Sequence, residues 1–215
     1  MDSIKLWFME REAVYSTLAL FYRDNLSRGL KILKETDLLE KLSEYEDDID
    51  LSDKAKVISG EMGGNKFNPG YEKELWEDYQ RLFVGPGRIL APPWESVYES
   101  RDRLIFGKSE LSVREFYHQF GLEVNPREAA DHLAFELSFM ARLCSIKTYD
   151  DFQKVLKILA SMEKFLKEHL CKWVPAWRNC VNSNAKIGFW IELSNITEAW
   201  VMKDLKEIEK IIKNK

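Results

Sequence analysis

Acidic and histidine side chains recur at helical spacing in two stretches, and they are the first candidates for chemistry. Glu115 and His118 form a Glu-x-x-His pair, while Glu128, His132 and Glu136 follow one another four residues apart. Di-iron helical bundles use the Glu-x-x-His unit, but they need two such pairs and two further glutamates on facing helices. The sequence holds no second pair. A metal-dependent helical oxidase that uses Glu115, His118 and two of the later residues, Glu128 and His132, stays an alternative, although surface or groove-lining charge is the simpler interpretation.

Motifs for covalent or nucleotide chemistry are missing from the sequence. The chain has no Gly-x-Ser-x-Gly elbow, no P-loop and no Rossmann glycine pattern. Gly85-Pro86-Gly87 does not suit a phosphate loop, because a proline lacks the amide donor that such loops use. We therefore expect no catalytic residue, no cofactor and no metal, and hence a protein that is not an enzyme.

A stiff segment at residues 84–98 is the clearest break in the helical pattern. It holds half of the six prolines, and Pro92 and Pro93 directly precede Trp94. Proline interrupts a helix and biases its neighbours toward extended backbone. One interpretation is that Trp94 plugs the core between two halves of the molecule. The other is a preordered apolar wall for a peptide, because proline and tryptophan offer large contact area and lose little conformational entropy on binding.

Asp131 and His132 stand just after a second break, marked by Asn125-Pro126, near the start of an expected helix. A carboxylate in the first turn complements the helix macrodipole, so the aspartate alone has a structural explanation. The histidine gains nothing from the dipole at that end. The pair is therefore a candidate binding element on the polar face of the helix.

Hydrophobic periodicity places these residues on an all-α scaffold. For example, Val155, Leu159, Met162 and Leu166 recur at helical spacing. The pattern predicts one helical bundle domain over residues 1–215, with the rigid proline-rich loop in its middle. We expect helices over residues 3–23, 25–34, 36–44, 52–62, 71–83, 109–119, 128–146, 149–170 and 185–213, and a kink or an end at Pro175.

Composition narrows the class of protein and its compartment. The chain has 215 residues, 32 basic and 36 acidic, and a formal net charge of −4. This mild acidity argues against a nucleic-acid partner. Charges interrupt the first apolar run, and no stretch is long enough for a membrane span. The three cysteines, Cys144, Cys171 and Cys180, are an odd number without CxxC spacing. This pattern excludes a disulfide framework and a strong zinc motif, and it fits a reducing cytoplasm.

Three sequence blocks resemble the TorD/DmsD chaperones of molybdenum redox enzymes. The first block comprises Tyr79–Pro86 (YQRLFVGP) and Pro92–Tyr98 (PPWESVY). The second, Glu128–His132 (EAADH), is similar to the family's Glu-Pro-x-Asp-His motif. The third, Phe165–Pro175 (FLKEHLCKWVP), is similar to the family's FLxxHLxxWxP stretch. The blocks occur in the family's order and span roughly residues 75–177.

Two positions depart from the family pattern. Glu95 stands where DmsD-type members usually carry a glycine after the tryptophan, and Ala129 replaces the motif proline. We expect the extra carboxylate of Glu95 to change the charge of the groove and therefore the preferred leader.

The resemblance implies an all-helical, non-enzymatic cytoplasmic chaperone. Such a protein binds the twin-arginine leader of a molybdopterin-containing oxidoreductase precursor, assists cofactor insertion and delays export until folding is complete. Peripheral contact with the export machinery, and a monomer or a homodimer, are compatible with it. An adaptor for a folded redox partner is the alternative from another class.

A leader has a cationic end and then an apolar h-region, so its site needs an apolar wall with acids at the edge. Leu75 is a further candidate for the wall, and Glu99 for the acidic edge. The residues that we expect to bind the leader are Trp76, Tyr79, Phe83, Pro93, Trp94, Glu95, Ser96, Tyr98, Glu128, Asp131 and His132.

Overall fold

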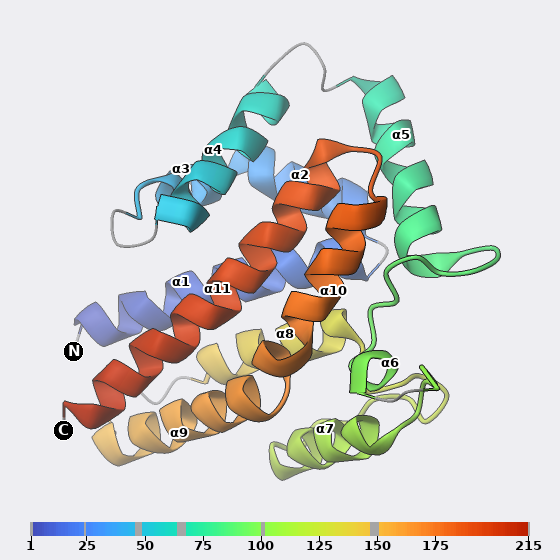
Figure 1. Ribbon diagram of the computed structural model, residues 1–215. Coiled ribbons are helices and arrows are strands. Elements are labelled where there is room, and N and C mark those ends of the chain that lie inside the picture. Colours follow the sequence, from blue (N-terminus) through green and yellow to red (C-terminus); the bar gives the residue numbers. More distant parts are fainter. Residues whose placement is uncertain are drawn as a thin grey trace.

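The computed structural model describes residues 2–23, 25–45, 49–63, 68–99, 102–146 and 151–214. Across these ranges the chain forms helices joined by loops, with no strand, which confirms the all-α prediction (Figure 1). The helices are α1 Asp2–Tyr22, α2 Leu26–Glu35, α3 Leu38–Ser43, α4 Ile49–Gly63, α5 Pro69–Tyr79, the π-helical turn Gln80–Val84, α6 Ser96–Glu99, α7 Lys108–Gln119, α8 Leu133–Cys144, α9 Phe152–Glu168, α10 Leu170–Asn184 and α11 Gly188–Lys213.

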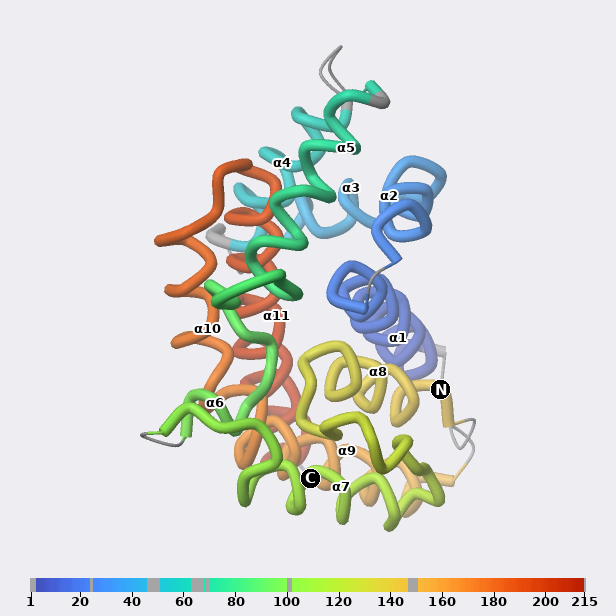
Figure 2. Tube along the Cα trace, turned by 90° about the vertical axis from the view of Figure 1, so that its right-hand side faces the viewer, coloured from blue at the N-terminus to red at the C-terminus, as the bar shows by residue number. Residues whose placement is uncertain are grey.

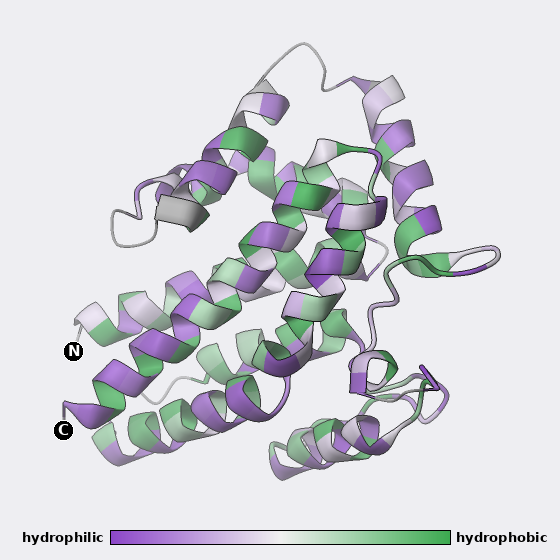
Figure 3. Cartoon of the chain, viewed as in Figure 1, coloured by the Kyte–Doolittle hydropathy of each residue, from purple (hydrophilic) through white to green (hydrophobic). Residues whose placement is uncertain are grey.

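Each long helix turns one apolar face inward, as the banding of polar and apolar residues along the ribbons shows (Figure 3). In α9 the side chains of Val155, Leu159, Met162 and Leu166 are all buried. Phe152, at the first position of that helix, is exposed. The helical spacing therefore predicts the buried face of α9 well, except at its amino-terminal end.

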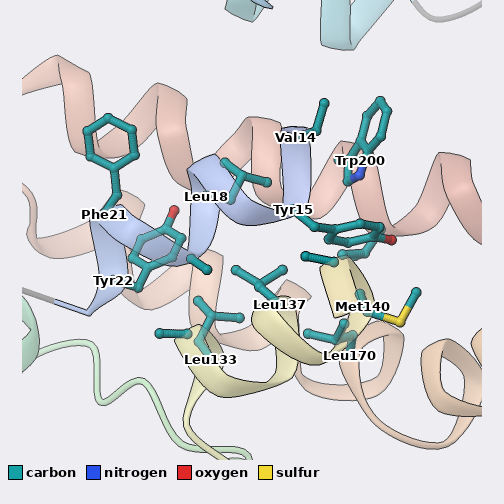
Figure 4. Packing of buried hydrophobic residues seen from close by; sticks show 14 of the residues in the cluster. Val14, Tyr15, Leu18, Phe21, Tyr22, Leu133, Leu137, Met140, Leu170 and Trp200 are labelled. Carbon is teal, nitrogen blue, oxygen red and sulfur yellow. The ribbon is translucent and has the colours of Figure 1, made fainter. Parts of the chain in front are cut away.

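The core is centred on α1, which packs against α8. Tyr15, Leu18 and Tyr22 of α1 lie opposite Leu133 and Leu137 of α8, and all of them are buried (Figure 4). Apolar side chains from the other helices continue this cluster. The first turn of α8 is thus fixed by core packing, and it is the turn that follows the Asp131–His132 pair.

Polar side chains inside the molecule tie α1 to α11, which runs beside it (Figures 1 and 2). Arg11 Nε donates to Asp204 Oδ1 at 2.6 Å, and the Tyr15 hydroxyl donates to Asp204 Oδ2 at 2.7 Å. The hydroxyls of Tyr22 and Thr197 lie 2.9 Å apart. Because buried charges are tolerated only with such partners, these contacts fix how α1 and α11 sit together.

Two expected helix boundaries are wrong. The helix expected over 128–146 begins only at Leu133, because residues 131–133 pair with the proline-rich loop instead. Glu128 therefore does not share a helical face with Glu136. The other error is the possible helix end at Pro175, since α10 continues past it to Asn184.

None of the helices in the described ranges combines the length and the apolar character that crossing a bilayer requires.

Candidate functional site

The proline-rich loop and the segment before α8 are joined by a short antiparallel bridge. Trp94 and His132 are the paired residues. The amide of Leu133 donates to the carbonyl of Pro93 at 2.9 Å, and the amide of Glu95 donates to the carbonyl of Asp131 at 3.1 Å. The prolines keep residues 92–94 extended, which leaves their carbonyls free for this pairing. The first and second sequence blocks thus meet in space.

Asp131 strengthens this bridge from the inside. Its carboxylate is fully buried, and Oδ2 accepts a hydrogen bond of 2.8 Å from the amide of Ser96, the first residue of α6. Burial raises the pKa of Asp131, and the hydrogen bonds from Ser96 act in the opposite direction. The side chain therefore holds α6 against the second block and does not reach the surface.

Glu95 also lies inside the molecule. Its Oε2 is 2.8 Å from Nδ1 of His169, and both side chains are buried. Burial raises the pKa of Glu95, while the neighbouring His169 lowers it. The expectation that this carboxylate changes the charge of the groove is therefore wrong, because its partner is an imidazole of the third sequence block.

Glu136 completes a buried polar cluster that joins all three blocks. Its Oε2 accepts a hydrogen bond of 3.1 Å from Nε1 of Trp173, and the carboxyl is fully buried in α8. Burial raises the pKa of Glu136 well above its ordinary value, and the nearby charge of Glu95 raises it further. The residues that gave the sequence its family resemblance are thus largely those that hold the site together.

The raised pKa of Glu136 predicts how stability depends on pH. An acid with a raised folded-state pKa stabilises the fold fully below its unfolded pKa of about 4.5, and this contribution is lost as pH rises through the folded pKa. We expect Glu136→Gln to remove this loss, so that its free energy of unfolding changes less between pH 4.5 and 8 than that of the wild type. Urea titrations at several pH values measure it.

Glu168→Gln is the matched control, because that carboxylate is exposed at the end of α9. It should leave the pH profile of the wild type unchanged. An equal loss of stability at every pH in Glu136→Gln would contradict the assignment.

A cavity of about 460 Å³ opens beside the bridge. Trp94 is half-buried in its wall, with its ring edge against the imidazole of His132 at 5.2 Å between centroids. Trp94 is therefore not sealed in the core, and the first of its two sequence interpretations is wrong. The lining residues are Tyr22, Arg23, Tyr79, Trp94, Ile105, Phe106, Arg127, Glu128, Ala129, His132 and Phe135.

His132 is a neutral hydrogen-bonding group in this wall. Its Nδ1 accepts a hydrogen bond of 3.1 Å from the amide of Ala134 and caps α8. Burial, together with the charge of Arg23, lowers the pKa of His132 to about 4. At neutral pH the remaining proton is on Nε2, because Nδ1 is the acceptor. The imidazole thus offers the cavity an N–H donor without adding a charge.

The charged residues at the cavity are not mainly acidic. Glu128 is exposed and lines it, but so do Arg23 and Arg127. Of the four acids expected at the edge, Glu95 and Asp131 are buried, and Glu99 is exposed but does not line the cavity. The acidic edge that the sequence suggests is therefore absent from the described lining.

The predicted site residues divide into three groups. Tyr79, Trp94, Glu128 and His132 line the cavity. Behind the lining lie buried Phe83, Pro93, Glu95, Ser96 and Asp131. Outside the lining, Trp76 is exposed and stacks on Tyr79 at 5.4 Å, Tyr98 stacks on Trp173 at 5.6 Å, and Leu75 is buried.

Sequence reasoning missed several lining residues. Ile105 and Phe106 belong to a loop without periodicity, and their only signal is an apolar run, Leu104–Phe106, between Arg103 and Gly107. Phe135 follows the second block by three residues, and its ring lies 5.8 Å from that of His132.

The alternative metal centre finds no support in the geometry. Among the described residues, no three His, Cys, Asp or Glu side chains come together as metal ligands. The four side chains proposed for it, Glu115, His118, Glu128 and His132, therefore do not form a site, and Nδ1 of the last is engaged in capping α8.

Comparison with known proteins places all three blocks within one family. The family model described as nitrate reductase delta subunit matches residues 37–179. A probable Tat proofreading chaperone DmsD of Haemophilus influenzae is 27% identical over 88% of this chain and 87% of its own length. A chaperone protein TorD of Vibrio cholerae is 24% identical over 99% and 98%. A chaperone protein TorD of a Shewanella species is 32% identical over 65% of each chain.

These relatives are named as chaperones and not as enzymes, and two of them match over 87% or more of both chains. The family model covers more than half of the chain, including the bridge and the buried polar cluster. The chain belongs to the nitrate reductase delta subunit family and is a chaperone of the TorD/DmsD type.

Proposed function

We propose that this protein is a cytoplasmic, single-domain maturation chaperone that holds the twin-arginine leader of a molybdopterin-containing oxidoreductase precursor in the cavity beside Trp94. By binding the leader, the chaperone delays export until the cofactor has been inserted and the precursor has folded. The relatives named Tat proofreading chaperone and TorD support this class of client. The observation that carries the proposal is the apolar cavity built where the first and second sequence blocks meet.

The lining of the cavity suits the apolar h-region of a leader. Trp94, Phe106 and Phe135 offer aromatic surface, and Ala129 adds a small apolar side chain to the lining. His132 can donate a hydrogen bond to a peptide carbonyl, since its Nε2 carries the proton. A cavity of about 460 Å³ admits several apolar side chains but not a folded domain.

The energetics are appropriate for reversible capture. Burying on the order of 400 Å² of apolar leader surface contributes roughly 10 kcal/mol at about 25 cal/mol per Å². Association and the ordering of a flexible peptide offset several kcal/mol of this. The expected affinity is micromolar to submicromolar, which allows later release to the export machinery.

The arginine pair of the leader belongs outside the cavity. Arg23 and Arg127 line it, and like charges repel the cationic end of a leader from their side. The cavity is therefore assigned to the h-region, and discrimination by charge falls to surfaces farther along the peptide.

Calorimetry with synthetic peptides tests this assignment. We expect a complete twin-arginine leader to bind, and the same leader with serines in place of its h-region leucines to bind at least about 10-fold more weakly. A peptide that keeps the arginines in a polar sequence should not bind measurably. Equal affinity for the complete and the serine-substituted leader would contradict an apolar site.

The adaptor alternative makes a different prediction for the whole client. An adaptor for a folded partner retains the precursor after its leader is deleted, whereas a leader-binding chaperone loses it. Co-purification of the precursor with and without its leader therefore separates these two functions.

A further inference from the structure

The loop 102–107, between α6 and α7, carries apolar side chains that the fold does not bury. Leu104, Ile105 and Phe106 are exposed to 63%, 39% and 55%. Two of them, Ile105 and Phe106, also line the cavity beside Trp94. Neighbouring large apolar residues exposed at the mouth of a cavity mark an interaction surface more often than isolated ones do.

Both ends of this loop are fastened to α6. The guanidinium of Arg103 lies 5.7 Å from the ring centroid of Tyr98, within the range of a cation–π contact. At the other end, a Cβ on Gly107 would lie 3.1 Å from Cβ of Ser96, so the two backbones approach closely. The apolar tip is therefore presented by an anchored loop.

The loop also holds unfavourable backbone conformations. Arg103 has φ 51° and Phe106 has φ 66°, although neither is a glycine. Such conformations are costly for residues with a Cβ and persist where the surroundings enforce them. Here they accompany exposed apolar side chains, so the loop combines costly backbone conformations with apolar surface that the fold does not bury.

The charges around the loop indicate what covers it. Arg23 and Arg127 outnumber the one acid, Glu128, in the described cavity lining that Phe106 shares, which disfavours a cationic segment there. The adjacent walls are aromatic and aliphatic. An uncharged apolar stretch of peptide satisfies both conditions and would cover the aromatic ring of Phe106.

We propose that the loop 102–107 is an apolar clamp, with Phe106 as its main contact, that closes the cavity over the h-region of a bound leader. This inference rests on the proposed function for the identity of the peptide. It assigns to the loop a choice among leaders by the size and apolar character of their h-regions.

Phe106→Ser, compared with Leu111→Ser, tests the clamp. Leu111 is a matched control because it is exposed to 66% on α7 and does not line the cavity. We expect calorimetry with the complete leader to show about 10-fold weaker binding for Phe106→Ser and less than twofold change for Leu111→Ser. Phe106→Leu should recover most of the affinity, since it restores apolar contact.

A second probe separates the clamp from the proposed function. The dye anilinonaphthalene sulfonate is apolar and anionic, so it suits a cavity with aromatic walls and arginines. The fluorescence of the dye should be lower with Phe106→Ser than with the wild type. With Leu111→Ser it should equal that of the wild type. If the dye depends on Phe106 while no leader binds the wild type, the proposed function fails, and the loop covers an apolar ligand other than a leader. If leader and dye bind Phe106→Ser as they bind the wild type, the clamp is overturned and the proposed function stands.

Discussion

Trp94→Ala is expected to weaken leader binding at least about 30-fold while leaving the protein folded. The indole is half-buried in the cavity wall, so its removal takes away apolar contact area at the centre of the site. The bridge itself is made by backbone groups of Pro93, Glu95 and Leu133, which the substitution leaves in place. Calorimetry with the complete leader measures the loss, and circular dichroism reports the helical content.

Trp76→Ala is the control for this prediction. Trp76 is exposed to 38% and stacks on Tyr79, but it does not line the cavity. We expect its replacement to change the affinity less than threefold. An equal loss in both variants would mean that the leader contacts α5 as well as Trp94, as the sequence alone predicts, and would contradict its confinement to the cavity.

Asp131→Ala is expected to lower the free energy of unfolding by about 2 kcal/mol, because it leaves the buried amide of Ser96 without its acceptor. Asp131→Asn should recover most of this, since an amide oxygen accepts the same hydrogen bond. Burial already raises the pKa of Asp131, so the neutral replacement suits its surroundings. Chemical denaturation of both variants gives the comparison.

Leader binding distinguishes a supporting aspartate from one that contacts the peptide. If Asp131 only supports the bridge, affinity falls in the alanine variant together with stability and returns in the asparagine variant. A stable Asp131→Ala that has lost binding would show instead that the carboxylate contacts the leader.

The helices could be predicted from the sequence, because the spacing of their apolar residues matches the face that each helix buries. The stripe Val155, Leu159, Met162 and Leu166 is buried as expected. The loop before Trp94 could also be predicted, since its prolines exclude a helix there. The start of α8 could not, because the segment up to Leu133 pairs with residues 93–95, which lie far away in the sequence. Local helix propensity cannot predict this outcome, because the pairing partner that competes with helix formation lies elsewhere in the sequence.

The positions of the charged residues at the site were the hardest feature to predict from the sequence. From sequence, Glu95 and Asp131 are acids beside an aromatic segment, and acids are usually exposed. The structure buries both, one against His169 and the other on the amide of Ser96. The partner of Glu95 lies 74 residues away in the sequence, and the partner of Asp131 is a backbone amide 35 residues away. No local sequence pattern therefore predicts either contact. The contribution of Phe106 was missed for the opposite reason, because it follows no periodic pattern at all.

Photo-crosslinking from the h-region of a leader tests the location of the site most directly. A benzophenone side chain placed there should react with the loop 102–107 and with the first turns of α8, near Phe135. Another apolar cavity, of about 590 Å³, lies between α1, α2 and α3, where Leu6 and Met9 are exposed. Cross-links concentrated at Leu6 and Met9, with none at Phe106 or Phe135, would contradict the assignment of the leader to the cavity beside Trp94.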